Sequence, residues 1–327
     1  MSIIPSESFD GSNAALKADD LPVVTINVFP GGFNWGLYVG QDKGFFAGHG
    51  IVVEVHGTPD SMTQMTRLSQ GHFDIAMTAV DNIVAYVEGQ GQAPIGPQAE
   101  FFAFMGSDSG FLSLVTSPAN TYISDLAGKV LSVDAITTGY AFVLYEIMRR
   151  SGLDKEKGAY DIVGAGGMVQ RWESLRENRN DGTLLSAPYN IIAKNAGFAE
   201  LVKATDVIGV YQGNVAAARR SWAEKNNLKV VAYIRGYRDS IAWLYKASNR
   251  REAIEILRRH IPQMSQEVAE ASHQELLDPT RGFFRSGDID MKGLDCVLDL
   301  RSRYAQPSKP LRNPVHYCDL SFLAASR

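Results

Sequence analysis

The chain has 327 residues, enough for two domains of ordinary size, and its 45% of hydrophobic and 21% of charged residues are typical of a globular protein. The formal net charge of -4 argues against a nucleic-acid-binding protein, because such proteins usually carry a basic excess. The longest apolar runs fall far short of the roughly 20 residues that a transmembrane helix needs, and two cysteines are too few for a disulfide framework.

The first 20 residues differ from the rest of the chain. Ser, Asp, Asn and Ala dominate residues 1–20, which predicts a flexible N-terminal arm. No basic stretch followed by an apolar core is present there, so no secretory signal is visible as written. Two localisations follow: periplasmic if a signal peptide has been removed, and cytoplasmic if the chain is full length as written.

From residue 21 onward, short β-type runs alternate with helical patterns, which favours an α/β fold. Strands are expected at residues 23–29, 51–55, 73–78 and 101–105. Helices are expected between them at residues 35–44, 61–68 and 82–88. Because ligands bind at the carboxyl ends of strands in open α/β sheets, the turns after these strands are where a site is expected.

The same alternation restarts after residue 106. Further strands are expected at residues 111–115, 130–133, 160–163, 182–186 and 206–211, with a strong helix at 139–150. Beyond residue 214 the pattern turns mostly helical, at residues 216–226, 230–237, 240–245, 251–260 and 266–277. Two α/β units followed by helices predict two lobes with a ligand cleft between them.

Four segments carry a family resemblance. They are residues 36–54 with a Lys-Gly-Phe-Phe turn, residues 68–76 (LSQGHFDIA), residues 125–129 (DLAGK) and residues 218–226 (ARRSWAEKN). In this order they resemble substrate-binding proteins of the nitrate, sulfonate and taurine class of ABC transporters, a family that also contains the yeast pyrimidine-precursor synthase. The resemblance is specific for the family but not for a ligand.

The resemblance implies a two-lobed type II periplasmic-binding-protein architecture with additional C-terminal helices. One lobe would hold residues 21–106 and 211–327, and the other would hold residues 107–210. The chain would cross between the lobes near residues 106–111 and 209–213. The implied function is binding of a small organic solute, anionic or aromatic to heterocyclic, as the substrate-binding component of an ABC-type uptake system, with the permease as a partner.

The alternative is a cytoplasmic enzyme that uses the same fold and cleft on a small aromatic or heterocyclic substrate. Thr78 and Asn82 stand where the pyrimidine-precursor synthase has a Lys and a His, and Phe29-Pro30 stands where aromatic sulfinate desulfinases use a Cys. None of the six histidines has metal-site spacing, and the Gly-x-Ser-x-Gly motif is absent. We therefore prefer a binding protein without metal or cofactor.

The turns after the strands of the first lobe supply candidate ligand-binding residues. Trp35 could form a flat apolar wall or be an ordinary core residue, and Asp81 could face the cleft or cap the next helix. The candidates in this lobe and at the two crossings are Asn34, Trp35, Gly57, Thr58, Asp81, Asn82, Ser107, Asp108 and Tyr211.

In the second lobe, the helix at 139–150 follows a strand directly, so its free N–H groups predict a site for a carboxylate or sulfonate, with plain capping by a Thr as the alternative. Tyr189 is a candidate stacking ring or else a buried Tyr with a satisfied hydroxyl. The glycine-rich run at 164–167 is expected to be an ordinary turn. The candidates here are Thr137, Thr138, Gly139, Tyr140, Pro188 and Tyr189.

The expected charge of the ligand depends on the neighbouring acids and bases. Asp81, Asp108 and Asp134 would repel an anion if they face the cleft, or would select one that also carries a donor. No Arg or Lys in the strand-end turns is an obvious counter-ion, so a dianion is disfavoured. An aromatic or heterocyclic monoanion fits the Trp and Tyr content best.

Overall fold

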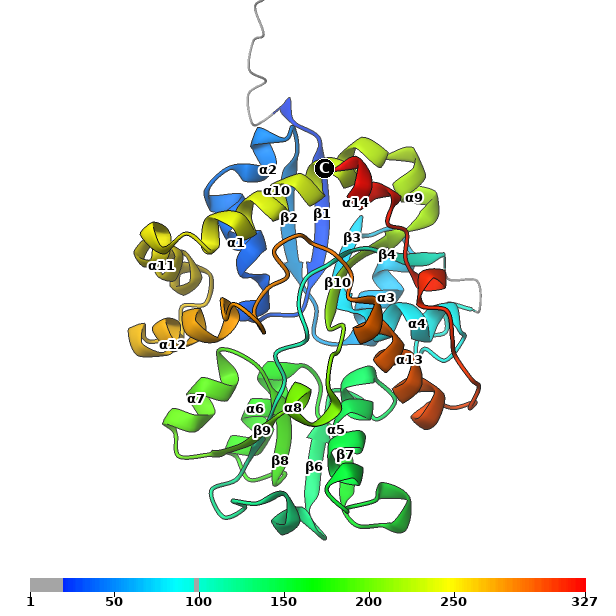
Figure 1. Ribbon diagram of the computed structural model, residues 1–327, viewed down its shortest axis with the longest axis vertical. Helices are drawn as coiled ribbons and strands as arrows, with labels where there is room; N and C mark the ends of the chain where they lie inside the picture. The colour runs from blue at the N-terminus through cyan, green and yellow to red at the C-terminus, as the bar shows by residue number, and fades with distance from the viewer. Residues whose placement is uncertain (1–19, 97–99) are drawn as a thin grey trace, which may run out of the picture.

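In a computed structural model of the protein, residues 20–96 and 100–327 are described. Of the predicted arm at residues 1–20, only Asp20 belongs to this part, so the arm stays a prediction. The described chain builds two five-stranded mixed sheets flanked by helices, which lie one above the other in Figure 1. The predicted α/β fold is therefore confirmed.

The first sheet and the helices against it form what we call lobe I. Its strands are β1 (Val23–Val28), β2 (Val52–Gly57), β3 (Ile75–Ala79), β4 (Phe101–Gly106) and β10 (Asn214–Arg219), in the order β2-β1-β3-β10-β4. Its helices are α1 (Trp35–Asp42), α2 (Phe45–Gly48), α3 (Ser61–Ser69), α4 (Val80–Val87), α9 (Arg220–Lys225), α10 (Asn227–Leu244) and α14 (Ser321–Ala325). Every residue of β4 is buried, as expected of a strand covered on both faces.

The second sheet and its helices form lobe II. Its strands are β5 (Ser113–Thr116), β6 (Val130–Val133), β7 (Asp161–Gly164), β8 (Gly182–Leu185) and β9 (Ala199–Lys203), in the order β7-β6-β8-β5-β9. Its helices are α5 (Gly139–Arg150), α6 (Met168–Arg176), α7 (Tyr189–Asn195) and α8 (Ala204–Ile208). In both sheets one strand runs antiparallel between the parallel strands and the far edge strand, so the carboxyl ends of the parallel strands share one edge.

The sequence pattern misassigns the region around the second crossing. Residues 206–211, which the pattern predicts as a strand, contain the end of α8 and part of the crossing, whereas β9 lies earlier. Strand β10 takes up the start of the helix predicted at 216–226. Its run of three alanines favours a helix by propensity, but these residues are fully buried between β3 and β4, and packing in the sheet outweighs the propensity.

Two extended segments connect the lobes and touch each other. The first follows β4 and the second precedes β10. The Asp108 carboxylate accepts hydrogen bonds from the backbone N–H of Gly110 (2.7 Å) and from the Asn214 side chain (3.1 Å). The Gly213 N–H donates to the Asp108 carbonyl at 2.9 Å, and a Cβ at Gly213 would collide with Gly110. The two connections are therefore joined to each other by hydrogen bonds where the chain passes between the lobes.

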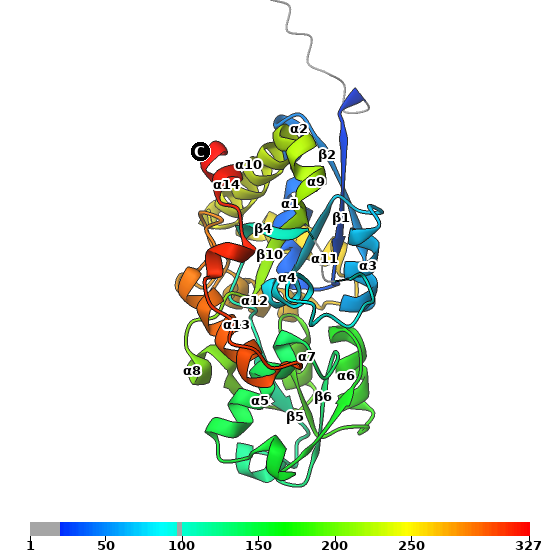
Figure 2. The same cartoon turned by 90° about the vertical axis from the view of Figure 1, so that its right-hand side faces the viewer.

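The C-terminal part adds the helices α11 (Arg250–His260), α12 (Gln266–Leu276) and α13 (Met291–Tyr304). Helix α13 packs against α4 of lobe I and also against α5 of lobe II, and both views show it beside the junction of the lobes (Figures 1 and 2). Within residues 20–96 and 100–327, no helix is long and apolar enough to cross a membrane.

A candidate ligand site between the two lobes

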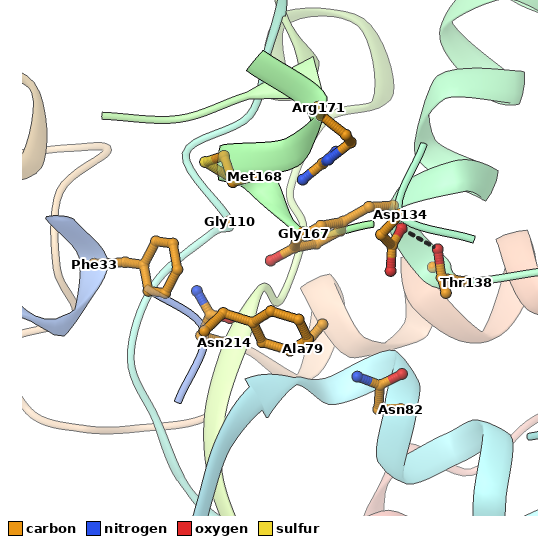
Figure 3. Close-up of a pocket in the computed structure, with 13 residues that line it drawn as sticks. Phe33, Ala79, Asn82, Gly110, Asp134, Thr138, Gly167, Met168, Arg171 and Asn214 are labelled. Atoms are coloured by element: carbon orange, nitrogen blue, oxygen red, sulfur yellow. Dashed lines mark hydrogen bonds between the residues drawn. The ribbon is translucent and has the colours of Figure 1, made fainter. Parts of the chain in front are cut away.

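A cavity of about 50 Å³ lies between the lobes. Its walls come from the ends of strands and the beginnings of helices, as open α/β sheets place them. Lobe I contributes Phe29, Phe33, Ala79 and Asn82, the connections contribute Gly110 and Asn214, and lobe II contributes Asp134, Thr138, Gly139, Tyr140, Gly167, Met168 and Arg171. Figure 3 shows Arg171 and Met168 on the wall opposite Asn82 and Asn214.

Arg171 is the most informative residue of the lining. It lies one turn into α6, and its side chain is only 3% exposed. Its Nε and Nη1 atoms have no hydrogen-bond partner among the described residues. Burial lowers the pKa of Arg171, and the nearby Asp134 carboxylate partly opposes this effect. A buried cation with unpaired donors is costly, so this wall of the cavity is suited to an anionic group.

Tyr140 supplies a second unpaired donor from the first turn of α5. Its phenol oxygen is buried without a hydrogen-bond partner in the described chain. Burial raises the pKa of Tyr140 well above its usual value, and the negative charge of Asp108 adds to this. The phenol therefore stays protonated and can donate a hydrogen bond to a ligand.

The beginning of α5 lines the cavity, and its local hydrogen bonds explain why. The Thr138 hydroxyl accepts from the Ala141 N–H at 3.4 Å and donates to the Asp134 carboxylate at 2.6 Å, so Thr138 caps the helix and also orients Asp134 (Figure 3). The next residue, Gly139, lies where the two lobes touch. A Cβ at this position would collide with the Asp81 side chain of α4.

Asp134 follows β6 and lines the same cavity as Arg171. Burial raises the pKa of Asp134, whereas the Arg171 charge and the Thr138 hydrogen bond lower it. These two described residues nevertheless form no salt bridge with each other. The cavity therefore presents separated acidic and basic groups rather than a closed ion pair.

Four of the predicted site residues line the cavity, namely Asn82, Thr138, Gly139 and Tyr140. Asn82 donates to the Thr78 hydroxyl at 2.8 Å, so the two positions compared with the synthase are bonded to each other. The other predicted residues lie outside the lining: Asn34, Trp35, Gly57, Thr58, Asp81, Ser107, Asp108, Thr137, Pro188, Tyr189 and Tyr211.

Trp35 and Asp81 illustrate why residues in strand-end turns miss the cavity. Trp35 is fully buried in lobe I and its indole N–H donates to the Ala253 carbonyl at 3.1 Å, so it is a core residue. Asp81 forms a two-pronged salt bridge with Arg301, at 2.7 and 2.6 Å, and neither faces the cavity nor serves as the cap of α4. Both side chains are already satisfied by partners far away in the sequence.

The remaining turn residues mostly satisfy their own surroundings. Asn34 donates to the Phe29 carbonyl (2.6 Å), and Thr58 donates to the Asp60 carbonyl (3.0 Å). The hydroxyl of Ser107 bonds that of Tyr237 (2.8 Å). Gly57 ends β2, Asp108 joins the connections, Pro188 precedes α7, and Tyr211 is buried beside Tyr140.

Two further residues connect the lobes instead of lining the cavity. Tyr189 is buried at the start of α7, and its hydroxyl accepts from Gln263 at 3.2 Å. The Thr137 carbonyl accepts from Arg301 at 3.2 Å. A backbone bond from Gly32 to Ala187, 3.1 Å long, also joins the lobes. The two lobes are therefore in direct contact around the cavity, and we call this arrangement the closed form.

Sequence reasoning missed Phe33, Met168, Arg171 and Asn214. The search for a counter-ion was confined to the strand-end turns, and Arg171 lies one helical turn beyond the glycine-rich run at 164–167, inside α6. A usable signal existed in that run: a glycine turn after a strand brings the first turn of the next helix to the same edge of the sheet. Extending the search by one helical turn would have included Arg171.

Comparison with known proteins adds to this geometry. A family model described as NMT1/THI5-like matches residues 34–250. A comparison with curated proteins finds no significant match. Among the described residues, no group of three or more His, Cys, Asp or Glu side chains is placed to hold a metal ion.

Solved structures of similar fold cover nearly the whole chain. The ligand-binding component of an ABC-type import system from Staphylococcus aureus, with zinc bound, is 14% identical, with a TM-score of 0.74 and coverage of 94% of this chain and 99% of that chain. The periplasmic nitrate-binding protein NrtA from Synechocystis PCC 6803 is 12% identical, with a TM-score of 0.73 and coverage of 94% and 85%. The alkanesulfonate-binding protein SsuA from Xanthomonas axonopodis pv. citri, bound to MOPS, is 11% identical, with a TM-score of 0.68 and coverage of 86% and 90%. These likenesses confirm the predicted periplasmic-binding-protein fold.

Proposed function

Because the chain belongs to the NMT1/THI5-like family, we propose that it captures a small organic anion in the cavity between its lobes, as the substrate-binding component of an ABC-type uptake system. In this role the two lobes close around the ligand, and a permease receives it. The proposal places the protein in the periplasm, where the similar binding proteins from Synechocystis and other bacteria work.

The observation that carries the proposal is the unpaired guanidinium of Arg171. A charged hydrogen bond from a buried group contributes about 1.5–3 kcal/mol when it is made, and leaving it unmade costs a comparable amount. The closed cavity therefore gains most from a ligand that brings a negative charge to Arg171. The Tyr140 phenol, which is also unpaired among the described residues, provides a second donor on the same side.

The apolar part of the lining supports an organic ligand rather than a bare inorganic ion. Phe29 and Phe33 of lobe I and Met168, which lies beside Arg171 on α6, form the apolar part of the lining, and Phe33 and Met168 point into the cavity in Figure 3. Aromatic and thioether side chains pack well against the apolar atoms that join an anionic group to the rest of an organic ligand. We therefore propose a carboxylate or sulfonate monoanion with an aromatic or other apolar part.

The test compares ligands that the purified protein retains from a small-molecule extract, identified by mass spectrometry after denaturation. Wild type should retain a monoanion unchanged, and Arg171→Gln should retain about tenfold less of it or lower, as expected for the loss of one charged hydrogen bond. Arg176→Gln is the matched control, because Arg176 is exposed on the same helix. Full retention by Arg171→Gln would refute the proposed anion site, and multiple-turnover conversion of the ligand would favour an enzyme instead.

A further inference from the structure

The closed cavity is small compared with the groove outside it. The cavity has a volume of about 50 Å³, whereas an adjoining surface groove has about 460 Å³. By the same measure a single water needs roughly 10–15 Å³, so the cavity holds only a head group of a few atoms. A larger ligand must extend beyond it while the lobes remain closed.

The cavity and the outer groove have one lining residue in common. Asp134 lines both spaces. On the outer side the groove runs between Asp60 to Met62, at the start of α3 in lobe I, and the turns after β6 and β7 in lobe II. Gly164 and Gly166 leave the floor of these turns free of side chains. A ligand leaving the cavity in the closed form would therefore pass the Asp134 carboxyl.

Each lobe also contributes one exposed apolar side chain to the groove. Met62 of lobe I is 47% exposed and Ile136 of lobe II is 48% exposed, and both line the groove. A single exposed apolar residue needs no explanation, but two that face one groove from opposite lobes offer a surface for an apolar group. Closing on such a group would bury both side chains.

Building on the proposed function, we infer that Asp134 is a specificity-determining residue: it accepts a hydrogen bond from an N–H or O–H donor on a ligand whose anionic group sits beside Arg171. The rest of the ligand then extends along the outer groove between Met62 and Ile136. The ligand class is an organic acid that also carries a donor group and has an apolar substituent.

The separation of Asp134 from Arg171 gives this selectivity its physical basis. Because the two described residues form no salt bridge, each remains available to a different part of one ligand. An acid without a donor would place only acceptor or apolar atoms against the Asp134 carboxyl, which then has no side-chain hydrogen bond beyond the one from Thr138 and faces a like charge. A site built in this way rejects such an acid as well as attracting its donor-bearing relative.

The experiment again identifies small molecules retained from a cell extract, now for wild type, Asp134→Asn and Ile136→Lys. Asn keeps an oxygen that can accept from Thr138, so the α5 cap survives the first change. Lys at position 136 puts a charge on the apolar side of the groove. Leu228→Lys is the matched control, because Leu228 is 80% exposed on α10, outside the groove.

We expect wild type and Leu228→Lys to retain acids that carry an N–H or O–H donor, and Asp134→Asn to retain about tenfold less of them. Ile136→Lys should lose preferentially those with an apolar substituent. If the acids retained by wild type lack a donor, or if both groove variants retain the same set in the same amounts, the inference is overturned while the anion site stands. Failure of the proposed function has a different signature: Arg171→Gln retains what wild type retains, or wild type retains no acid.

Discussion

Two buried arginines of this protein differ in a way that separates structure from function. Arg301 is 1% exposed and donates to both oxygens of Asp81, to the Gln90 side chain and to the Thr137 carbonyl. Arg171 is 3% exposed, and its Nε and Nη1 have no partner among the described residues. Burial alone is therefore a poor guide to the role of a charged residue, whereas the state of its donors is a good one.

The paired arginine belongs to a set of contacts through which α13 joins the lobes. Arg301 reaches Asp81 in lobe I and the Thr137 carbonyl in lobe II. Two and three residues further along α13, Arg303 and Tyr304 donate to Glu146 of α5 at 2.7 and 2.8 Å. These bonds hold the closed form together from outside the cavity, and a ligand on Arg171 would do so from inside it.

Removing the paired arginine should have the largest effect on stability. Arg301→Met leaves the Asp81 carboxylate buried without its partner, and breaking a buried pair in this way costs about 3–5 kcal/mol. We expect the free energy of unfolding, measured by urea denaturation, to fall by about that amount.

The double variant Asp81→Asn with Arg301→Met provides the control for this prediction. Because it removes the isolated charge, it should recover part of the loss, and the two changes should be strongly non-additive. A single Arg301→Met variant as stable as wild type would contradict the view that this ion pair is a structural element.

The contrast between the two arginines also shows which parts of the structure could be predicted from the sequence and which could not. The strand and helix periods and the family resemblance were enough for two α/β units and for the start of α5 at the cleft, because these are local patterns. The partners of Asp81 could not be found in this way, since Arg301 lies 220 residues further along the chain. Which residues of a turn face the cavity depends on such distant contacts.

Arg171 was overlooked and Trp35 was kept as a candidate for the same reason: the direction of neither side chain can be found from its neighbours in the sequence. Trp35 begins α1 directly after a strand-end turn, but its indole N–H donates to the Ala253 carbonyl of α11, and its ring is fully buried in the core. Arg171 lies in α6, a helix that the sequence pattern did not predict, and a charged residue on a helix usually marks its solvated face. The rotation of α6 about its own axis decides that Arg171 faces the cavity. The hydrophobic periodicity of one sequence does not determine this rotation.

A second prediction tests the α13 contacts through pH. Burial tends to raise the pKa of Glu146, but hydrogen bonds from Arg149, Arg150, Tyr304 and Arg303 outweigh burial and hold it well below its usual value. A lowered pKa stabilises the fold fully above the unfolded-state value of about 4.3, and this stabilisation is lost as the pH falls below it. Glu146→Gln should therefore lower the free energy of unfolding by about 2 kcal/mol near pH 7.

The difference between wild type and Glu146→Gln should shrink as the pH is lowered below about 4, as followed by denaturation at each pH. Glu173→Gln serves as the control, because Glu173 is exposed on α6. A wild-type advantage that stays constant down to about pH 3 would show that the charge of Glu146 is not what stabilises the contact.

The smallest effect, and the one of opposite sign, is expected at the unpaired arginine. Arg171→Met replaces a buried cation without a full set of partners by an apolar side chain of similar length, which removes a desolvation cost. We expect the free energy of unfolding without ligand to stay the same or to rise by about 1 kcal/mol, while retention of acids is lost. Arg176→Met, at the exposed position of the same helix, should change neither quantity.

The gain in Arg171→Met should depend on pH through Asp134. Burial already raises the pKa of Asp134, and the charge of Arg171 is what opposes this, so its removal raises that pKa further. A carboxyl whose pKa is higher in the folded state destabilises the fold at a pH above that value and ceases to do so once it is protonated. The advantage of Arg171→Met over wild type should therefore be larger near pH 5 than near pH 8, as measured by urea denaturation at the two values. A ligand-free protein that loses about 3 kcal/mol on this substitution would place Arg171 with Arg301, as a residue that holds the fold together.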